Sequence, residues 1–242
     1  MRNLKTLFSK KNIAIITCYD ATFASYLSSI DCDALLVGDS LGMLIKGQSS
    51  TLEVKMSEVV YHTQAVRRGA PFLPIISDMP SNSFLNKKMA LKNARLLINA
   101  GADIIKIEGD SDILEIVKYL SLNKIPVCGH IGFMPQIKKA QNLTDEELFT
   151  KVKNLEDAGL KMIVMSMTSS KNDKIITKTL KIPTIAFRSS SFCNGEVELL
   201  YDLLGISTSS LTNKKRENDK MMSLIKLNKL EQFIKKIHAR KI

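Results

Sequence analysis

The chain has 242 residues, of which 45% are hydrophobic and 24% are charged. This length and composition suit one globular domain with a full hydrophobic core, and they exclude a disordered or fibrous protein. The net charge of +11 is concentrated late in the chain, where the basic clusters at 214–216 and 235–236 contain no aromatic side chain that would stack on a base. We therefore expect a solvated helix there and no binding to nucleic acid or membranes, with RNA binding as the alternative.

The four cysteines are scattered along the chain and form no CxxC motif: Cys18, Cys32, Cys128 and Cys193. This spacing suits neither zinc nor a disulfide framework, and it predicts reduced thiols in the core of an intracellular protein. Residues 1–10 lack the continuous apolar run of a signal peptide, and no segment approaches the ~20 apolar residues of a membrane span. We therefore expect a cytoplasmic protein.

Short β-branched runs alternate with segments of helical periodicity, which is typical of βαβ units and a parallel sheet. There are eight such runs, at residues 13–17, 34–37, 73–77, 104–107, 125–128, 162–165, 182–186 and 203–206. Eight parallel strands close a TIM barrel, so we predict one α/β barrel domain over residues 1–242. An open doubly wound sheet is the alternative, but it would normally carry a glycine-rich phosphate loop after its first strand, where this chain has Thr17-Cys18-Tyr19-Asp20.

Three of the intervening helices have clear apolar faces. One covers residues 89–98, and a second covers 145–155 behind Thr144 as its N-cap. The last begins near Asp219 and places apolar residues on one side, namely Leu227, Leu230, Ile234 and Ile237.

Polar residues gather where the predicted strands end. In a barrel the βα loops at the carboxyl ends of the strands form the mouth that carries catalytic groups. The residues at these ends are Tyr19, Asp20, Asp39, Ser40, Asp78, Lys106, Glu108 and His130. Carboxylates of Asp39, Asp78 and Glu108 are hard oxygen ligands that suit Mg²⁺ better than zinc.

Lys106 and Glu108 lie two residues apart in a strand, so their side chains point into the same cavity. If a metal ion chelates a 2-oxo acid there, Lys106 can neutralise the remaining charge and Ser40 can donate to the substrate carboxylate. Such chelation acidifies the carbon beside the ketone.

Structural roles are the alternatives for several of these residues. Asp39 and Asp78 could each be the N-cap of the helix that follows, and His130 could be a core histidine. We expect His62 and His238, which lie in helical stretches, to be structural.

These residues, in this order, resemble the ketopantoate hydroxymethyltransferase family. The resemblance is dense over residues 13–136. It rests on Thr17-Cys18-Tyr19-Asp20, Val37-Gly38-Asp39-Ser40-Leu41-Gly42, Ser50-Thr51-Leu52, Tyr61-His62-Thr63 with the run 65–71, Lys106-Ile107-Glu108-Gly109, and the run 126–132 with Pro135-Gln136.

The resemblance implies a TIM barrel of the phosphoenolpyruvate/pyruvate type, assembled as a homo-oligomer, usually a decamer. It implies transfer of a one-carbon unit from 5,10-methylenetetrahydrofolate to the 2-oxo acid 3-methyl-2-oxobutanoate, giving 2-dehydropantoate in pantothenate synthesis. Asp39, Asp78 and Glu108 match the magnesium ligands of the family, and Ser40 and Lys106 match its substrate contacts. We also expect Asp39, Asp78 and His130 to contact the substrate, and Lys106 to take part in catalysis.

The second half of the chain departs from the family. In the family, a glutamate at the end of the sixth strand is the general base that removes the proton from C3 of the substrate. This chain has Ser166 there, and a serine cannot take that proton unaided. The loop after Gln136 is shorter than in the family. The glycine-rich turn after the seventh strand is replaced by residues 186–190, which include Phe187 and Arg188, and the closing segment is replaced by residues 207–211. These changes affect the folate side of the mouth.

Three functions are compatible with this pattern. The first is an active hydroxymethyltransferase whose base has moved, either to a metal-bound hydroxide or to a carboxylate such as Glu196. The second is a barrel that binds metal and 2-oxo acid without turnover, in a regulatory or scaffold role. The third is a different Mg²⁺-dependent C–C bond enzyme acting on another 2-oxo acid.

Overall fold

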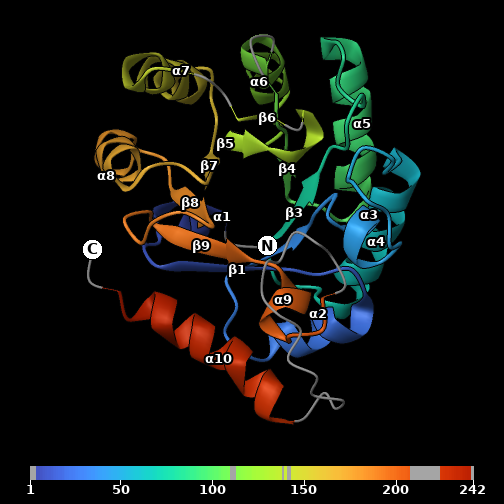
Figure 1. Ribbon diagram of the computed structural model, residues 1–242. Helices are drawn as coiled ribbons and strands as arrows, with labels where there is room; N and C mark the ends of the chain where they lie inside the picture. The colour runs from blue at the N-terminus through green and yellow to red at the C-terminus, as the bar shows by residue number, and fades with distance from the viewer. Residues whose placement is uncertain (1–3, 110–112, 138, 141–142, 208–223, 241–242) are drawn as a thin grey trace.

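Eight parallel strands close into a barrel in the computed structural model, which describes residues 4–109, 113–137, 139–140, 143–207 and 224–240 (Figure 1). Each strand pairs with the next around the ring, and the ring closes between β1 and β9. The barrel strands, in spatial order, are β1 (Ile13–Thr17), β2 (Ala34–Val37), β3 (Ile75–Asp78), β4 (Ile104–Lys106), β5 (Val127–Met134), β7 (Met162–Ser166), β8 (Thr184–Phe187) and β9 (Gly195–Glu198). A short strand, β6 (Lys139–Ala140), pairs antiparallel with the end of β5. The closed ring confirms the predicted barrel over the open doubly wound sheet.

The longer helices surround this ring on the outside, and the first helix lies against one end of the barrel (Figure 1). Their bounds are α1 (Leu4–Ser9), α2 (Ala21–Ser28), α3 (Leu41–Leu44), α4 (Met56–Gly69), α5 (Lys87–Ala100), α6 (Ile113–Leu122), α7 (Asp145–Asp157), α8 (Ser170–Thr179), α9 (Leu200–Leu203) and α10 (Leu224–His238), with the 3₁₀ helix η1 (Pro135–Ile137). The predicted helices at 89–98 and 145–155 lie within α5 and α7, and Thr144 caps α7 as expected by accepting the Glu147 N–H at 3.2 Å.

Seven of the eight predicted strand segments are confirmed, and the eighth is wrong. Residues 203–206 end the short helix α9 and turn through Gly205, which has a φ of 67°. The last barrel strand is instead β9, where two glutamates interrupt the apolar run that the prediction relied on. Because strand side chains alternate, Val197 faces the barrel interior while Glu196 faces outward.

The final helix is confirmed where the structure describes it. The side chains of Leu230, Ile234 and Ile237 are buried in the core, as the apolar stripe predicts. The predicted start at Asp219 and the side chain of Leu227 lie outside the described residues.

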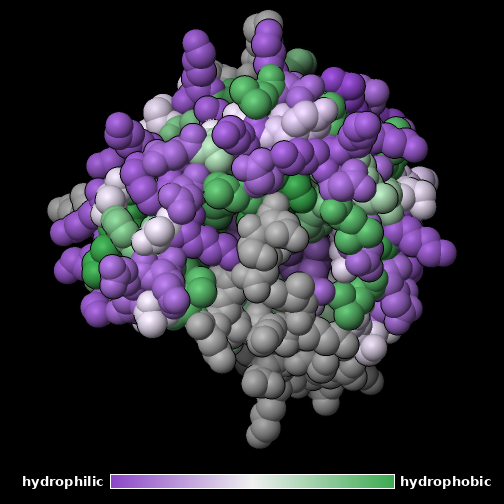
Figure 2. Space-filling view, turned by 90° about the horizontal axis from the view of Figure 1, so that it is seen from above, coloured by the Kyte–Doolittle hydropathy of each residue, from purple (hydrophilic) through white to green (hydrophobic). Residues whose placement is uncertain are grey.

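Side-chain alternation divides the core into two layers. In the inner layer, every second residue of each strand points into the barrel. Leu7 of α1 packs against this layer from one end. The outer layer packs the other faces of the strands against the helices. All four cysteines are buried and free, as expected, and Cys128 lies in the inner layer. The face in Figure 2 carries mostly polar side chains with scattered hydrophobic ones. Within the described residues, no helix is long and apolar enough to cross a membrane.

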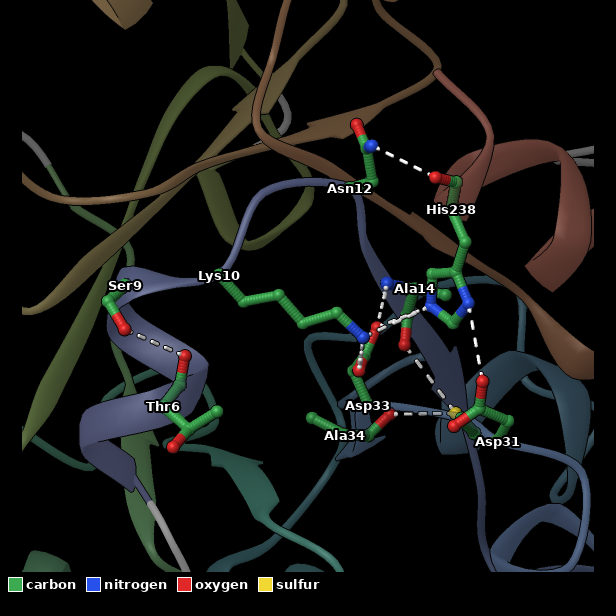
Figure 3. Close-up of polar contacts among 10 residues, drawn as sticks. Thr6, Ser9, Lys10, Asn12, Ala14, Asp31, Asp33, Ala34 and His238 are labelled. Carbon is green, nitrogen blue, oxygen red and sulfur yellow. Dashed lines mark hydrogen bonds and ion pairs between the residues drawn. The ribbon is translucent and has the colours of Figure 1, made fainter. Parts of the chain in front are cut away.

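The C-terminal helix is fastened where the strands begin (Figure 3). The Asp33 carboxylate accepts the Ala14 N–H at 2.8 Å, lies 2.9 Å from Nε2 of His238 and forms an ion pair with Lys10. Asn12 donates to the backbone oxygens of His238 at 3.1 Å and of Arg240 at 2.7 Å. His238 is therefore structural, as predicted.

The Asp33 carboxylate contacts three partners at once. We predict that Asp33→Asn lowers the free energy of unfolding by about 1–3 kcal/mol, because the ion pair is lost and the amide NH₂ group faces hydrogen-bond donors. The matched control is Asp31→Asn, since the Asp31 side chain is 88% exposed and lies 3.4 Å from the same histidine. This control should change stability by less than about 0.5 kcal/mol. Urea unfolding of both variants measures the difference, and equal losses would contradict the role of Asp33.

Candidate active site

Polar side chains lie at the mouth of the barrel, directly above the apolar residues of the inner layer. Ile76, Ile104 and Cys128 fill the interior, and the residues two positions later on the same strands are Asp78, Lys106 and His130. Since side-chain direction repeats every two residues, these three face the mouth. Glu108 continues the β4 series, and Asp39 with Ser40 follows β2 at the start of α3.

Lys106 on β4 forms an ion pair with Asp78 on β3 and lies near Glu108, which follows β4. Lys106 Nζ donates to one oxygen of Asp78 at 2.9 Å and lies 4.0 Å from Glu108 Oε2. The other Asp78 oxygen accepts the backbone N–H of Asp39 at 3.1 Å. All four side chains are buried. The predicted pairing of Lys106 with Glu108 in one cavity is therefore seen, with Asp78 as the closer partner of the lysine.

The carboxylates of Asp39 and Asp78 do not act as helix caps. The N-cap of α3 is Ser40, with no side-chain cap bond, and that of α5 is Asn86. By contrast, Asp20 is a true N-cap, because its carboxylate accepts the Phe23 N–H at 2.9 Å. The capping alternative is therefore wrong for both Asp39 and Asp78.

Gln136 links the two ends of this polar network. Its side-chain amide donates to Asp39 Oδ2 and to the backbone oxygen of Met79, each at 3.0 Å, and its backbone N–H donates to Glu108 Oε1 at 2.6 Å. Sequence reasoning gave Gln136 no role, although it closes the motif at Pro135-Gln136. The available signal was its place directly after a strand whose earlier residues already face the mouth.

His130 completes the network from β5. Its Nδ1 lies 2.5 Å from Glu108 Oε2, while its Nε2 is buried without a hydrogen-bond partner among the described residues. His130 therefore belongs to the polar network at the mouth through its contact with Glu108.

Tyr19 and Ser40 form a second polar contact beside this network. The tyrosine hydroxyl lies 2.8 Å from Ser40 Oγ, and the Tyr19 backbone oxygen lies 2.6 Å from Nδ1 of His62. His62 thus supports the strand end that carries Tyr19, in line with its predicted structural role.

The charges in the mouth are unbalanced. Burial, together with the nearby carboxylates of Asp78 and Glu108, raises the pKa of Asp39 to about 8. Burial alone would lower the pKa of Lys106, but the charges of Asp78, Glu108 and Asp39 raise it instead. Burial opposes ionisation of Glu108, yet the contacts from His130, Lys106 and Gln136 lower its pKa. Three carboxylates therefore share one ammonium group.

This donor set fits Mg²⁺ in ligand type and in charge, because hard oxygens with surplus negative charge are what the ion prefers. The side chains are nevertheless turned onto Lys106, Gln136 and His130. Within the described part of the chain, no group of three or more His, Cys, Asp or Glu residues converges closely enough to hold a metal ion.

The β7–β9 side of the mouth has a different character. Ser166 ends β7 with a buried Oγ that has no partner among the described residues. Next to it in register, Phe187 ends β8, and Arg188 places its guanidinium 5.3 Å from the Phe187 ring centre and 3.1 Å from Asp202. No histidine or carboxylate therefore bonds to Ser166 Oγ in this part of the chain.

Glu196, proposed from sequence as a replacement base, is wrong for that role. Its side chain points away from the barrel interior and forms an ion pair with Arg240. The altered closing segment at 208–211 and parts of the loop after Gln136 lie outside the described residues.

Comparison with known proteins gives a consistent picture. The family model described as ketopantoate hydroxymethyltransferase matches residues 1–241. A protein of Buchnera aphidicola subsp. Acyrthosiphon pisum (strain 5A), named 3-methyl-2-oxobutanoate hydroxymethyltransferase, is 40% identical over 235 residues, covering 90% of this chain and 88% of its own length. The protein of that name from Wigglesworthia glossinidia brevipalpis is 42% identical over 206 residues, covering 81% of this chain and 78% of its own.

Solved structures match the fold at low sequence identity. A 2,3-dimethylmalate lyase, described as a PEP mutase/isocitrate lyase superfamily member, has a TM-score of 0.67 at 14% identity and covers 98% of this chain and 95% of its own. Phosphonopyruvate hydrolase in complex with oxalate and Mg²⁺ has a TM-score of 0.64 at 10% identity, covering 78% of this chain and 76% of its own. These likenesses confirm the predicted barrel type.

The crowded carboxylates lead to a pH-dependent prediction for the metal-free protein. A raised pKa means that the folded chain holds a proton on Asp39 that the unfolded chain has released, so ionisation of Asp39 costs stability as the pH rises from about 4 to about 8. Asp39→Asn removes that cost and keeps an acceptor for Gln136. In EDTA, the variant should gain about 1–3 kcal/mol over the natural chain at pH 8.5 and much less at pH 5. Urea unfolding at both pH values measures this, and a gain that is equal at both would contradict it.

Proposed function

The chain belongs to the ketopantoate hydroxymethyltransferase family, and from this premise we propose that it transfers a hydroxymethyl group from 5,10-methylenetetrahydrofolate to 3-methyl-2-oxobutanoate, giving 2-dehydropantoate. The observation that carries the proposal is the buried network of Asp39, Asp78, Lys106 and Glu108 at the mouth. It joins the residue types that recognise a 2-oxo acid through a divalent cation. The phosphonopyruvate hydrolase complex with oxalate and Mg²⁺ supports a small carboxylate and this ion as ligands in the same fold.

Asp39, Asp78 and Glu108 would hold the ion. When bound, Mg²⁺ would supply electrostatic stabilisation of the negative charge that develops on the keto oxygen. Lys106 sits against Asp78 and can share the charge of the substrate carboxylate. Ser40, oriented by Tyr19, can donate a hydrogen bond to the same carboxylate, and His130 can offer its unpartnered Nε2.

Removal of the C3 proton is the step for which no dedicated base is evident at the mouth among the described residues. Ser166 occupies the position of the base, and removing a well-placed general base typically costs about 10²–10⁴-fold in rate. We therefore propose slow turnover. Of the two replacement bases considered from sequence, Glu196 is excluded by its position, which leaves a metal-bound hydroxide.

A second candidate is a barrel that binds metal and 2-oxo acid without turnover, in a regulatory or scaffold role. The observation that favours it is the buried, unpartnered Ser166 hydroxyl beside Phe187, opposite an intact polar network. We also propose one domain over residues 1–242, a cytoplasmic location and a homo-oligomer, as the family resemblance and the composition suggest.

Proton exchange separates the two candidates. In deuterated water with Mg²⁺, an active chain should exchange the C3 proton of 3-methyl-2-oxobutanoate, as followed by NMR. Ser166→Glu should speed both this exchange and 2-dehydropantoate formation by about 10²-fold or more, because it returns a carboxylate to the strand end. Ser166→Ala is the matched control and should leave the rate within about 2-fold of the natural chain. Substrate binding without any exchange would sink the transferase and leave the binding barrel. Exchange without product would point to another 2-oxo acid reaction.

Metal binding can be tested separately. We predict that Asp78→Asn weakens Mg²⁺ binding by at least about 10-fold, since it removes an anionic oxygen from the site. Asp20→Asn is the control, because Asp20 follows another barrel strand, β1, but caps α2, a task that asparagine performs equally well. Isothermal titration with MgCl₂ measures both affinities. An unchanged affinity in Asp78→Asn would remove this carboxylate from the set of ligands.

A further inference from the structure

Besides the three carboxylates of the proposed metal site, the β7–β8 side of the barrel carries a fourth buried carboxylate, which the proposed function does not use. Asp173, in the first turn of α8, is 0% exposed. Its Oδ2 lies 2.6 Å from Ser189 Oγ, accepts Ser190 Oγ–H at 2.6 Å and accepts the Ser190 N–H at 2.9 Å, while Oδ1 accepts the Thr168 hydroxyl. We call Thr168, Asp173, Ser189 and Ser190 the Asp173 cage. Three hydroxyls, one amide and the N-terminal end of α8 surround this charge, and no ion pair reaches it within the described residues.

The cage joins two loops that follow neighbouring strands. Thr168 lies two residues after Ser166, the last residue of β7, and Ser189 lies two residues after Phe187, the last residue of β8. Each loop begins with a non-glycine residue in the left-handed region, Met167 at φ 52° and Arg188 at φ 50°. Such residues persist only where their surroundings hold them. The shared carboxylate bridges the two turns, in addition to the direct contact of Ser189 Oγ with the Thr168 backbone oxygen at 3.1 Å.

A third strand end packs directly against this unit. A Cβ placed on Gly132 would lie 2.0 Å from the Ser166 backbone oxygen and 3.0 Å from Thr168 Cγ2, so β5 approaches the β7 loop as closely as only glycine allows. His130 lies two residues earlier on β5. The cage therefore supports the strand ends that carry Ser166 and Phe187, beside the neighbouring strand β5 that carries His130.

The cage also accounts for the lost glycine turn. The resemblance implies a glycine-rich turn after this strand, and the chain has Ser189 and Ser190 within the segment that replaces it. Both hydroxyls lie 2.6 Å from the same oxygen of Asp173. The segment that replaces the glycine-rich turn is therefore hydrogen-bonded to the loop after β7.

We infer that Asp173 is a positioning residue that holds the β7–β8 wall of the mouth in place for the second substrate. The 2-oxo acid contacts lie on β2, β4 and β5, at Ser40, Lys106 and His130, and none of these touches the cage. The wall formed by Ser166 and Phe187 is the side left for the one-carbon donor. This inference rests on the proposed function, whose failure the test below detects separately.

The experiment compares two steps in the full chain with Mg²⁺. Exchange of the C3 proton needs only the 2-oxo acid, whereas 2-dehydropantoate formation also needs 5,10-methylenetetrahydrofolate. Asp173→Asn should lower kcat/KM for the folate donor by about 10-fold or more, while the exchange rate and the KM for the 2-oxo acid stay within about 2-fold. Ser190→Ala removes one hydroxyl only, and should lower kcat/KM for the donor by about 3-fold with the same selectivity.

Asp103→Asn is the control for loss of a half-buried, hydrogen-bonded carboxylate away from the mouth. Asp103 lies at the opposite end of the barrel, where its Oδ2 accepts Arg67 Nη2–H at 2.5 Å and the Ile75 N–H at 2.9 Å. This variant should leave both steps within about 2-fold of the natural chain when assayed well below its unfolding temperature.

Each outcome decides the matter. Equal loss of exchange and transfer in Asp173→Asn and Ser190→Ala, or no loss in either step, would overturn the positioning role while leaving the transferase intact. A natural chain that exchanges the proton but neither forms product nor binds tetrahydrofolate in equilibrium dialysis would overturn the proposed function and this inference together. Selective loss of donor use, with the control unaffected, is the result we expect.

Discussion

A closed ring of parallel strands forces every second side chain into the barrel interior, and the rest of the structure depends on this alternation. Below the mouth, the inward positions carry Ile76, Ile104 and Cys128, which fill the interior with apolar volume. The same alternation then delivers Asp78, Lys106 and His130 to the mouth. The polar site and the apolar core are thus successive layers of one packing pattern.

Charge, and not shape alone, defines the site that results. Three buried carboxylates share one ammonium group, and burial, followed by the repulsion from Asp78 and Glu108, raises the pKa of Asp39. Lys106, Gln136 and His130 each satisfy part of that charge through a direct contact. Buried like charges of this kind destabilise a protein unless a cation or protons offset them. A surplus of negative charge held this firmly is consistent with a site that gains stability when a divalent ion and an anionic substrate arrive together.

The two halves of the mouth differ in the side chains that line them. The side formed by β2 to β5 keeps a continuous polar network, whereas the side formed by β7 to β9 holds a serine, a phenylalanine and a caged carboxylate. The Arg240 ion pair binds Glu196 on the outside, which removes the only acid of β9 that was considered as a base. The chain thus combines a continuous polar network on one side of the mouth with a mixed apolar and hydroxyl-lined wall on the other.

Sequence by itself determined the fold class, seven of the eight barrel strands and the identity of the polar network, because β-branched runs and strand-end acids are local signals. It missed β9, because Glu196 and Glu198 alternate with apolar residues in this strand. A prediction that looks for continuous apolar runs does not detect such a strand. It also gave Gln136 and Asp173 no role. Their roles follow from hydrogen bonds to residues distant in the chain, for example Gln136 to Asp39, and such contacts exist only after the ring closes. Tertiary structure alone decided which acids cap helices, which face the mouth and which are bound elsewhere, because these outcomes depend on the direction of a side chain and on the partners that the closed barrel brings within hydrogen-bond distance.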